Sequence, residues 1–264
     1  MGNHLYLTLR SVVVALQFLT RLPIPIQVPF DREHVARSVV FFPFCGAVIG
    51  LLTGLSLYAL QQVLPPLPAA ARALVCWIAL SGGLHLDGWM DTADGVLSHR
   101  SRERMLEIMK DSRVGAMGVI AGVMLLLVKF SALASLLAAG SGWLLVFACI
   151  PVWSRWWMAA SIAIWPYARQ SEGMGSLFAG VRGRHAASSA VVGLLIMAAL
   201  FLLTSKSEAD LLLFAMLPLG AALLGLLLGF WLYRKLGGQT GDTYGAMNEW
   251  IEAGLLLALT AAIA

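Results

Sequence analysis

Charged residues are scarce in this sequence. Only 12% of its 264 residues are Asp, Glu, Lys or Arg, whereas 59% are hydrophobic. An ordinary soluble domain is about one-quarter charged, so the composition excludes that class and predicts a protein that crosses a membrane several times. No change in composition along the chain marks a boundary, and we expect one membrane domain over residues 1–264.

Cysteine is also rare, and its pattern excludes two further classes. The three cysteines, Cys45, Cys76 and Cys149, each lie in an apolar run and form no C-x-x-C pair. We therefore expect small core residues, not disulfides or zinc ligands. The net charge of +4 comes from basic residues spread over loops, without the basic and aromatic stripe of a nucleic-acid-binding surface.

The N-terminal apolar segment lacks the small-x-small cleavage site of a signal peptide. Residues 5–22 are interrupted by Arg10 and Arg21 and are too short to cross a bilayer comfortably. We expect an interfacial or re-entrant helix that ends at Pro23 and Pro25.

The remaining hydrophobic runs predict an all-α bundle with about seven transmembrane helices of about 20 residues each. The first carries Gly46, Gly50 and Gly54 at every fourth position, which favours close helix packing. Residues 101–110 read as a short amphipathic helix on the membrane surface, with Ser101 as its N-cap. The expected spans are 39–64, 69 to the aspartates that follow, 115–139, 143–165, 187–204, 211–233 and 250–264.

The distribution of basic residues predicts the orientation of the spans. Segments 1–38, 88–113, 166–186 and 234–249 hold fourteen of the eighteen Lys and Arg residues. Because Lys and Arg concentrate in short cytoplasmic loops, we expect these four segments to share the cytoplasmic face. One site built from several of them is then expected.

Three aspartates follow the second span, in the segment GGLHLDGWMDTADG at 82–95. If this segment is helical, Asp87, Asp91 and Asp94 lie on one face. Two carboxylates about 6 Å apart repel by about 3 kcal/mol at an effective dielectric constant of about 20, which a bound cation relieves. Oxygen-only ligands favour Mg²⁺ or Mn²⁺. The alternative is a solvated helix end that carries acidic residues.

A second polar segment, GGQTGDTYGAMNEWIE, spans 237–252. Its glycines and threonines suit a backbone loop that wraps phosphate oxygens, and Asp242, Glu249 and Glu252 add hard ligands or a catalytic base. The alternative is a flexible loop between helices. The pattern Gly-Gly-x-x-x-Asp occurs both at 82–87 and at 237–242.

Three further polar residues fall in or beside the spans. Arg155 lies near the centre of the fourth span, where we expect an anion or a polar cavity opposite it; a displaced helix with Arg155 at the interface is the alternative. Lys129 is expected to extend to the membrane surface. His85 lies off the aspartate face, and we expect it to orient the metal ligands without binding the metal itself.

These motifs together resemble the cobalamin synthase family, the adenosylcobinamide-GDP ribazoletransferases. The resemblance rests on the polar positions of 83–95, 108–118 and 238–252, and extends to 18–23 and to Phe42-Pro43, so that it covers nearly the whole chain. Trp89 and Met90 depart from the smaller aliphatic residues expected there, which affects packing more than chemistry.

The resemblance implies a multi-pass enzyme of the bacterial inner membrane that faces the cytoplasm and depends on Mg²⁺. It would complete the nucleotide loop of cobalamin by joining adenosylcobinamide-GDP to α-ribazole or its 5′-phosphate, with release of GMP. A homo-oligomer is left open. The expected metal ligands are Asp87, Asp91 and Asp94; the catalytic residues Asp91, Asp94, Asp242 and Glu249; and the substrate-binding residues His85, Asp111, Arg113, Arg155, Gly238, Thr240, Gly241 and Glu252.

Other functions compete with this one. A membrane prenyltransferase or a CDP-alcohol phosphotransferase also uses an Asp-x-x-x-Asp motif, but a prenyltransferase is expected to have two aspartate-rich motifs, and the second here has only Asp242. A cation-coupled transporter would place its acids near the membrane midplane, whereas these are expected at one edge.

Overall fold

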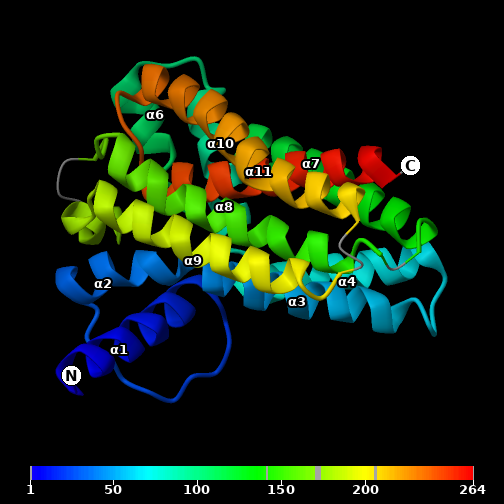
Figure 1. The fold of residues 1–264 in the computed structure, drawn as a ribbon. Coiled ribbons are helices and arrows are strands. Elements are labelled where there is room, and N and C mark those ends of the chain that lie inside the picture. Colours follow the sequence, from blue (N-terminus) through cyan, green and yellow to red (C-terminus); the bar gives the residue numbers. More distant parts are fainter. Residues whose placement is uncertain (1, 141, 170–173, 205–206, 264) are drawn as a thin grey trace.

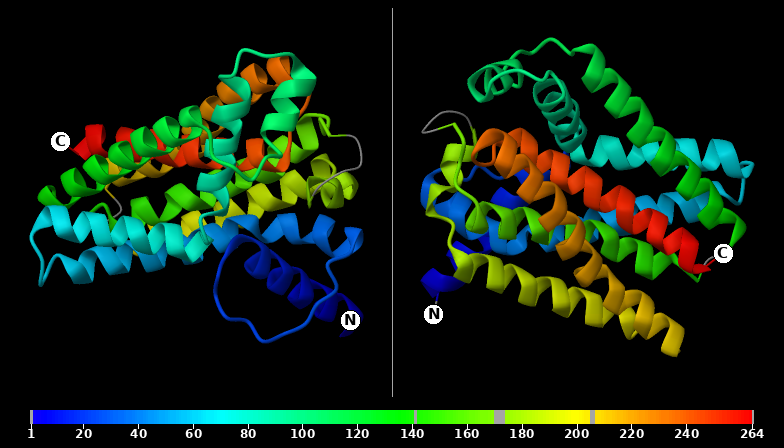
Figure 2. Two further views of the ribbon diagram at one scale, coloured as in Figure 1. Left: turned by 180° about the vertical axis from the view of Figure 1, so that it is seen from behind. Right: turned by 90° about the horizontal axis from the view of Figure 1, so that it is seen from above.

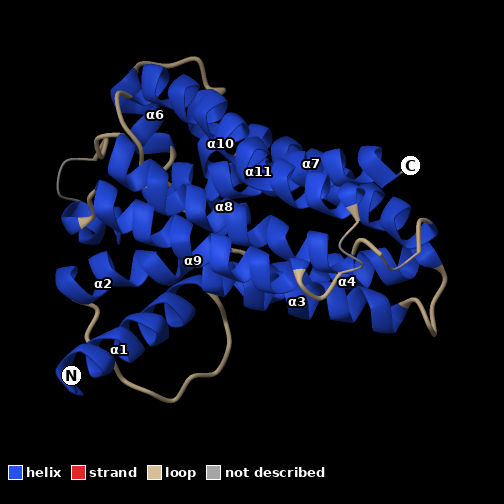
Figure 3. Cartoon of the chain, viewed as in Figure 1, coloured by secondary structure: helices blue, strands red, loops and turns tan. Residues whose placement is uncertain are grey.

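The protein forms a bundle of long helices (Figure 1). The structure is a computed structural model and describes residues 2–140, 142–169, 174–204 and 207–263. Within these ranges no strand is longer than an isolated bridge, and short loops connect most of the helices (Figure 3). The helices are α1 (Gly2–Leu19), α2 (Arg32–Ser38), η1 (Val39–Phe41), α3 (Phe42–Leu60), α4 (Pro66–Ser81), α5 (Leu84–Val96), α6 (Arg102–Ile108), α7 (Ala116–Ala138), α8 (Leu144–Ile164), η2 (Met174–Gly180), α9 (Gly183–Phe201), α10 (Glu208–Leu236) and α11 (Gly241–Ile263).

Six helical segments of the described chain are long and apolar enough to cross a membrane. They comprise the continuous run of α2, η1 and α3, followed by α7, α8, α9, α10 and α11; the bent pair α4 and α5 raises the number to as many as seven. The predicted polytopic all-α bundle is confirmed, and the predicted seven spans match the upper number. Helix α8 lies at the centre, in contact with α3, α9, α10 and α11.

Glycines bring α3 and α8 together as the sequence predicts. A Cβ atom on Gly46 would clash with the carbonyl group of Pro151, and one on Gly50 would clash with that of Ala148. Small residues let two backbones approach closely where the surrounding lipid offers no hydrophobic driving force. This contact fixes the position of α8, and Arg155, further along α8, lies in the interior of the bundle.

The chain turns sharply between α4 and α5, where the two helix axes form an angle of 89°. Gly82 and Gly83 occupy this turn with φ of 64° and 72°, a left-handed conformation that is costly for other residues. Helix α5 therefore leaves the line of α4 at nearly a right angle and packs against α7 and α11 (Figure 2).

The last helix begins earlier than its hydrophobicity predicts. The expected span 250–264 is wrong, because α11 runs over Gly241–Ile263 and leaves only 237–240 outside helices. Its start is fixed by a reciprocal pair of hydrogen bonds: the Thr243 N–H donates to Thr240 Oγ1 at 3.2 Å, and the Thr240 N–H donates to Thr243 Oγ1 at 2.7 Å. The predicted phosphate-wrapping loop is therefore mostly the first turns of a helix.

At the N-terminal end, α1 stops at Leu19, before the predicted prolines, and lies against α2 and α3 at the edge of the bundle (Figure 1). Its apolar part, Tyr6–Leu19, is shorter than a spanning helix. The predicted short helix after the aspartates is confirmed as α6, with the Ser101 side chain accepting a hydrogen bond from the Arg104 N–H.

Candidate active site

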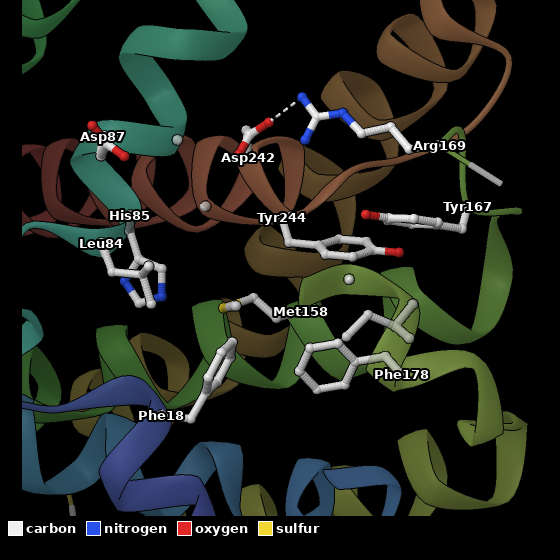
Figure 4. Close-up of a pocket in the computed structure, with 15 residues that line it drawn as sticks. Phe18, Leu84, His85, Asp87, Met158, Tyr167, Arg169, Phe178, Asp242 and Tyr244 are labelled. Atoms are coloured by element: carbon white, nitrogen blue, oxygen red, sulfur yellow. Dashed lines mark hydrogen bonds and ion pairs between the residues drawn. The ribbon is translucent and has the colours of Figure 1, made fainter. Parts of the chain in front are cut away.

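A pocket of about 230 Å³ lies at the end of the bundle where α5 crosses it (Figure 4). Its walls come from α1, α5, α8, η2, α11 and the segment after α8, so the polar segments expected to share one face do meet here. The polar side chains that line it are His85, Asp87, Tyr167, Arg169, Asp242 and Tyr244.

The glycines of both motifs allow α5 and α11 to touch at this pocket. A Cβ atom on Gly88 would lie 2.7 Å from the carbonyl oxygen of Asp242, and one on Gly245 would lie 3.1 Å from the Cα atom of His85. Backbone contact this close requires glycine. It places Asp87 and Asp242, each in the first turn of its helix, in the wall of one pocket.

Asp91 lies one turn further along α5 and is half-buried. Burial, reinforced by the negative charges of Asp87, Asp242 and Asp94, raises the pKa of Asp91 to about 7. A carboxyl group in this environment is partly protonated near pH 7, and a bound cation favours its ionised form. Asp87, Asp91 and Asp242 are from here on called the acidic cluster.

Asp94 does not join the acidic cluster. Its two carboxylate oxygens accept hydrogen bonds from the backbone N–H groups of Gly115 and Gly118, each at 2.7 Å. Because these groups begin α7, Asp94 satisfies donors that would otherwise have no helical partner. The structure therefore brings together two of the three expected metal ligands and gives the third a structural role.

Arg169 faces the acidic cluster and donates a hydrogen bond to Asp242 at 2.7 Å (Figure 4). Its position is set by a short parallel bridge between Tyr167 and Gln239. In this bridge the Ala168 N–H donates to the Gln239 carbonyl and the Gln239 N–H donates to the Pro166 carbonyl, both at 2.8 Å. In the sequence Arg169 belongs to the basic segment 166–186, which suits phosphate, although cytoplasmic placement alone predicts the same basic residues.

The other residues expected from the second motif divide between the pocket and its support. Gly241 lines the pocket. Gly238 lies against the Pro166 carbonyl, where a Cβ atom would approach to 2.6 Å, and Thr240 is buried at the start of α11. Gly238 and Thr240 hold the turn that positions Arg169 and Asp242.

Four charged side chains pair in the interior behind the pocket. Lys129 of α7 donates to Glu249 at 2.5 Å and to Glu252 at 2.7 Å, and Arg155 of α8 donates to the other oxygen of Glu252. All four are at most 7% exposed. The expected surface position of Lys129 is wrong, because two carboxylates of α11 face it inside the bundle. The anion expected opposite Arg155 is Glu252.

This buried network reaches the pocket through His85. An Arg155 N–H group lies 3.4 Å from His85 Nδ1, which therefore acts as acceptor and leaves the proton of a neutral ring on Nε2. His85 Nε2 is buried without a hydrogen-bond partner among the described residues. Arg155, Glu249 and Glu252 themselves do not line the pocket, and their charges are satisfied by one another.

Asp111 and Arg113, two of the expected substrate-binding residues, lie away from the pocket. The Arg113 guanidinium donates to Asp111 at 2.6 Å, and the Arg113 side chain is 88% exposed. These hydrogen bonds lower the pKa of Asp111 to about 2. The structure shows a surface ion pair in the loop before α7.

Aromatic and apolar residues complete the pocket and were not predicted from the motifs. They are Phe18, Met158, Tyr167, Phe178 and Tyr244. Phe18 and Tyr244 lie in segments that carry the family resemblance, whereas Met158, Tyr167 and Phe178 belong to ordinary hydrophobic or loop segments, and only the fold brings the five together. Tyr244 carried a weak signal, because it falls two residues after Asp242.

The donor set fits a hard cation that is shared with a substrate. Within the described residues, no group of three or more His, Cys, Asp or Glu side chains is arranged to hold a metal ion alone. Mg²⁺ is commonly held by one or two carboxylates together with substrate phosphates. The acidic cluster supplies such carboxylates, and the charge repulsion at Asp91 favours a cation there.

Fold and site together define a class: a polytopic helical membrane protein with an acidic, arginine-bearing pocket at one end of the bundle. The family model of cobalamin-5-phosphate synthase matches residues 11–260, and the chain belongs to this family. The predicted family and its transferase class are confirmed, against the prenyltransferase, CDP-alcohol phosphotransferase and transporter alternatives.

Curated relatives match more than nine-tenths of the chain. The adenosylcobinamide-GDP ribazoletransferase of Brevibacillus brevis is 42% identical, over 93% of this chain and 95% of its own length. Those of Desulfitobacterium hafniense and Escherichia coli are 39% and 38% identical, over 95% and 92% of this chain and 96% of each relative. No solved structure matches.

Proposed function

We propose that this protein transfers the cobinamide phosphoryl group of adenosylcobinamide-GDP to α-ribazole or its 5′-phosphate, with a Mg²⁺ ion held by Asp87 and Asp91. The observation that supports the proposal is that the two aspartate motifs, far apart in the sequence, line one pocket with an arginine. A diphosphate needs both a divalent cation and a cationic side chain to balance its charge.

The reaction is a substitution at phosphorus. A ribose hydroxyl oxygen of the acceptor bonds to the phosphorus atom that carries cobinamide. The bond from that phosphorus to the bridging oxygen breaks, and GMP leaves with the bonding electron pair. The hydroxyl proton passes to Asp242, the carboxylate of the acidic cluster that is not assigned to the cation.

The chain's own residues divide this work. Asp87 and Asp91 hold the cation, which when bound neutralises phosphate charge. Arg169 binds a phosphate oxygen, and Asp242 holds its guanidinium toward the pocket at 2.7 Å. His85 offers its Nε2–H, buried and without a partner among the described residues, to a substrate oxygen.

The pocket end of the bundle is proposed to face the cytoplasm of a bacterium, with the helices in the inner membrane. Support comes from the fourteen Lys and Arg residues in the four segments of that end, against Arg72 and Lys206 in the opposite loops. GDP-linked substrates and Mg²⁺ are then supplied from the same side as the pocket.

The test is GMP release by the purified protein in liposomes. Release should require both substrates and Mg²⁺, and should stop when the cation is chelated. Asp87→Asn should lower turnover by more than the roughly 10- to 100-fold that is lost when a residue supporting a metal ligand is replaced. Asp111→Asn, on the exposed loop outside the pocket, is the control and should retain activity. Full activity in chelator would refute the cation, and absence of product from wild type would refute the reaction.

A further inference from the structure

A second cavity adjoins the candidate active site. It has a volume of about 320 Å³ and lies beside the first pocket, because Ile162, Tyr167, Gly175, Phe178 and Tyr244 line both. Gly175 keeps this wall thin, since a Cβ atom there would clash with the ring of Tyr167. A ligand in the second cavity is thus separated from the acidic cluster by little more than two tyrosine side chains.

The two cavities differ in charge. The first contains Asp87, Asp242 and Arg169, whereas the only charged residue that lines the second, within the described chain, is Arg32. Four aromatic side chains line the second: Trp165, Tyr167, Phe178 and Tyr244. Flat aromatic ligands bind well against such surfaces, and a single arginine suits a phosphate group.

The position of Arg32 at this cavity follows from the capping and packing of α2, in which it is the first residue. Asp31 caps α2 by accepting a hydrogen bond from the His34 N–H at 2.9 Å. Helices α2 and η2 pack closely, because a Cβ atom added to Gly180 of η2 would lie 3.3 Å from the Cβ atom of Ala36. Among the residues that the structure describes, Arg32 has no carboxylate partner, while Arg37 on the same helix is paired with Glu33 at 2.9 Å.

We infer that the second cavity binds the acceptor nucleoside, with its flat base against the aromatic wall and a 5′-phosphate on Arg32. The inference rests on the proposed function and assigns one cavity to each substrate. A cavity of about 320 Å³ is at the small end of ligand pockets and suits a nucleoside, whereas the corrin ring stays outside and only the diphosphate reaches the acidic cluster. The shared wall brings the ribose hydroxyl beside the phosphorus that it attacks.

The test compares the two acceptors in proteoliposomes. Arg32→Ala should raise KM for α-ribazole 5′-phosphate about 10- to 100-fold, as loss of a charged hydrogen bond does, and leave KM for α-ribazole and for adenosylcobinamide-GDP unchanged. Arg32→Lys should recover part of the loss. Arg37→Ala on the same helix is the matched control and should behave as wild type.

A second variant tests the aromatic wall. Trp165→Ala should raise KM for both acceptors, Trp165→Phe should raise it less, and equilibrium dialysis with labelled acceptor should show the same order of affinity. An equal effect of Arg32→Ala on both acceptors, no effect on either, or an effect on the corrinoid alone would overturn the inference. These outcomes leave the transferase activity of the wild type intact, so failure of the inference is distinguishable from failure of the proposed function.

Discussion

Arg155 and Glu252 form an ion pair between α8 and α11 that is completely shielded from solvent. Lys129 on α7 binds the other oxygen of Glu252 at 2.7 Å and also contacts the face of Trp77, whose ring centre is 4.3 Å away. Three spanning helices are thereby joined by charges in the interior of the bundle. Removing one member leaves the remaining charges of the network unbalanced in the interior.

The first prediction follows from this pairing. Glu252→Gln should lower the free energy of unfolding by about 3–5 kcal/mol, because it leaves two buried cations with one carboxylate between them. Thermal unfolding in detergent measures the loss. Glu107→Gln is the control, since Glu107 pairs with Arg104 on the surface and should change stability by less than about 1 kcal/mol. Equal stability of the two variants would contradict the structural role of the network.

The second prediction separates two aspartates of one motif. Asp94→Ala should destabilise the protein by about 1–2 kcal/mol, because the N–H groups of Gly115 and Gly118 lose their acceptor. Asp91→Asn should abolish turnover without loss of stability, since it removes a repelling charge. The measurement is GMP release beside thermal unfolding. A stable Asp94→Ala protein without activity would return Asp94 to the metal site.

These two aspartates show what the sequence predicted and what it did not. Spacing placed Asp87, Asp91 and Asp94 on one side of α5, and α5 is indeed helical. Which neighbouring helix each carboxylate meets depends on the 89° turn at Gly82 and Gly83, which spacing does not reveal. The partners of Lys129, likewise, lie 120 and 123 residues further along the chain.

The start of α11 was predicted wrongly for a related reason. Glycine and threonine are poor helix formers, so residues 237–249 read as a loop. The helix forms because Thr240 and Thr243 cap it and because Gly245 packs against His85 of α5. The repeated Gly-Gly-x-x-x-Asp pattern has a structural counterpart: Gly82 and Gly237 both end a helix with positive φ, and Asp87 and Asp242 lie in the first turn of the next.

The third prediction concerns pH. Because the pKa of Asp91 is raised to about 7, the carboxyl group is protonated below that pH and ionised above it. A proton and a cation compete for it, so the apparent affinity for Mg²⁺ should rise between about pH 6 and pH 8. Mg²⁺ titrations of GMP release at several pH values measure this. In Asp91→Asn the same pH dependence should disappear from Mg²⁺ binding; its persistence would assign the titration to another group.

The fourth prediction tests the contact that forms the pocket. Gly88→Ala places a methyl group 2.7 Å from the carbonyl oxygen of Asp242, and a backbone atom cannot rotate away as a side chain can. Helices α5 and α11 must then separate, at a cost of about 1–3 kcal/mol, and Asp87 and Asp242 no longer face one substrate. Gly241→Ala is the stability control, because nothing lies within 4 Å of the added atom and alanine favours a helix. Thermal unfolding and GMP release should show Gly88→Ala losing both stability and turnover, while Gly241→Ala unfolds at or above the wild-type temperature. If Gly88→Ala were as stable and active as wild type, the close approach of the two motifs would not be required for the site.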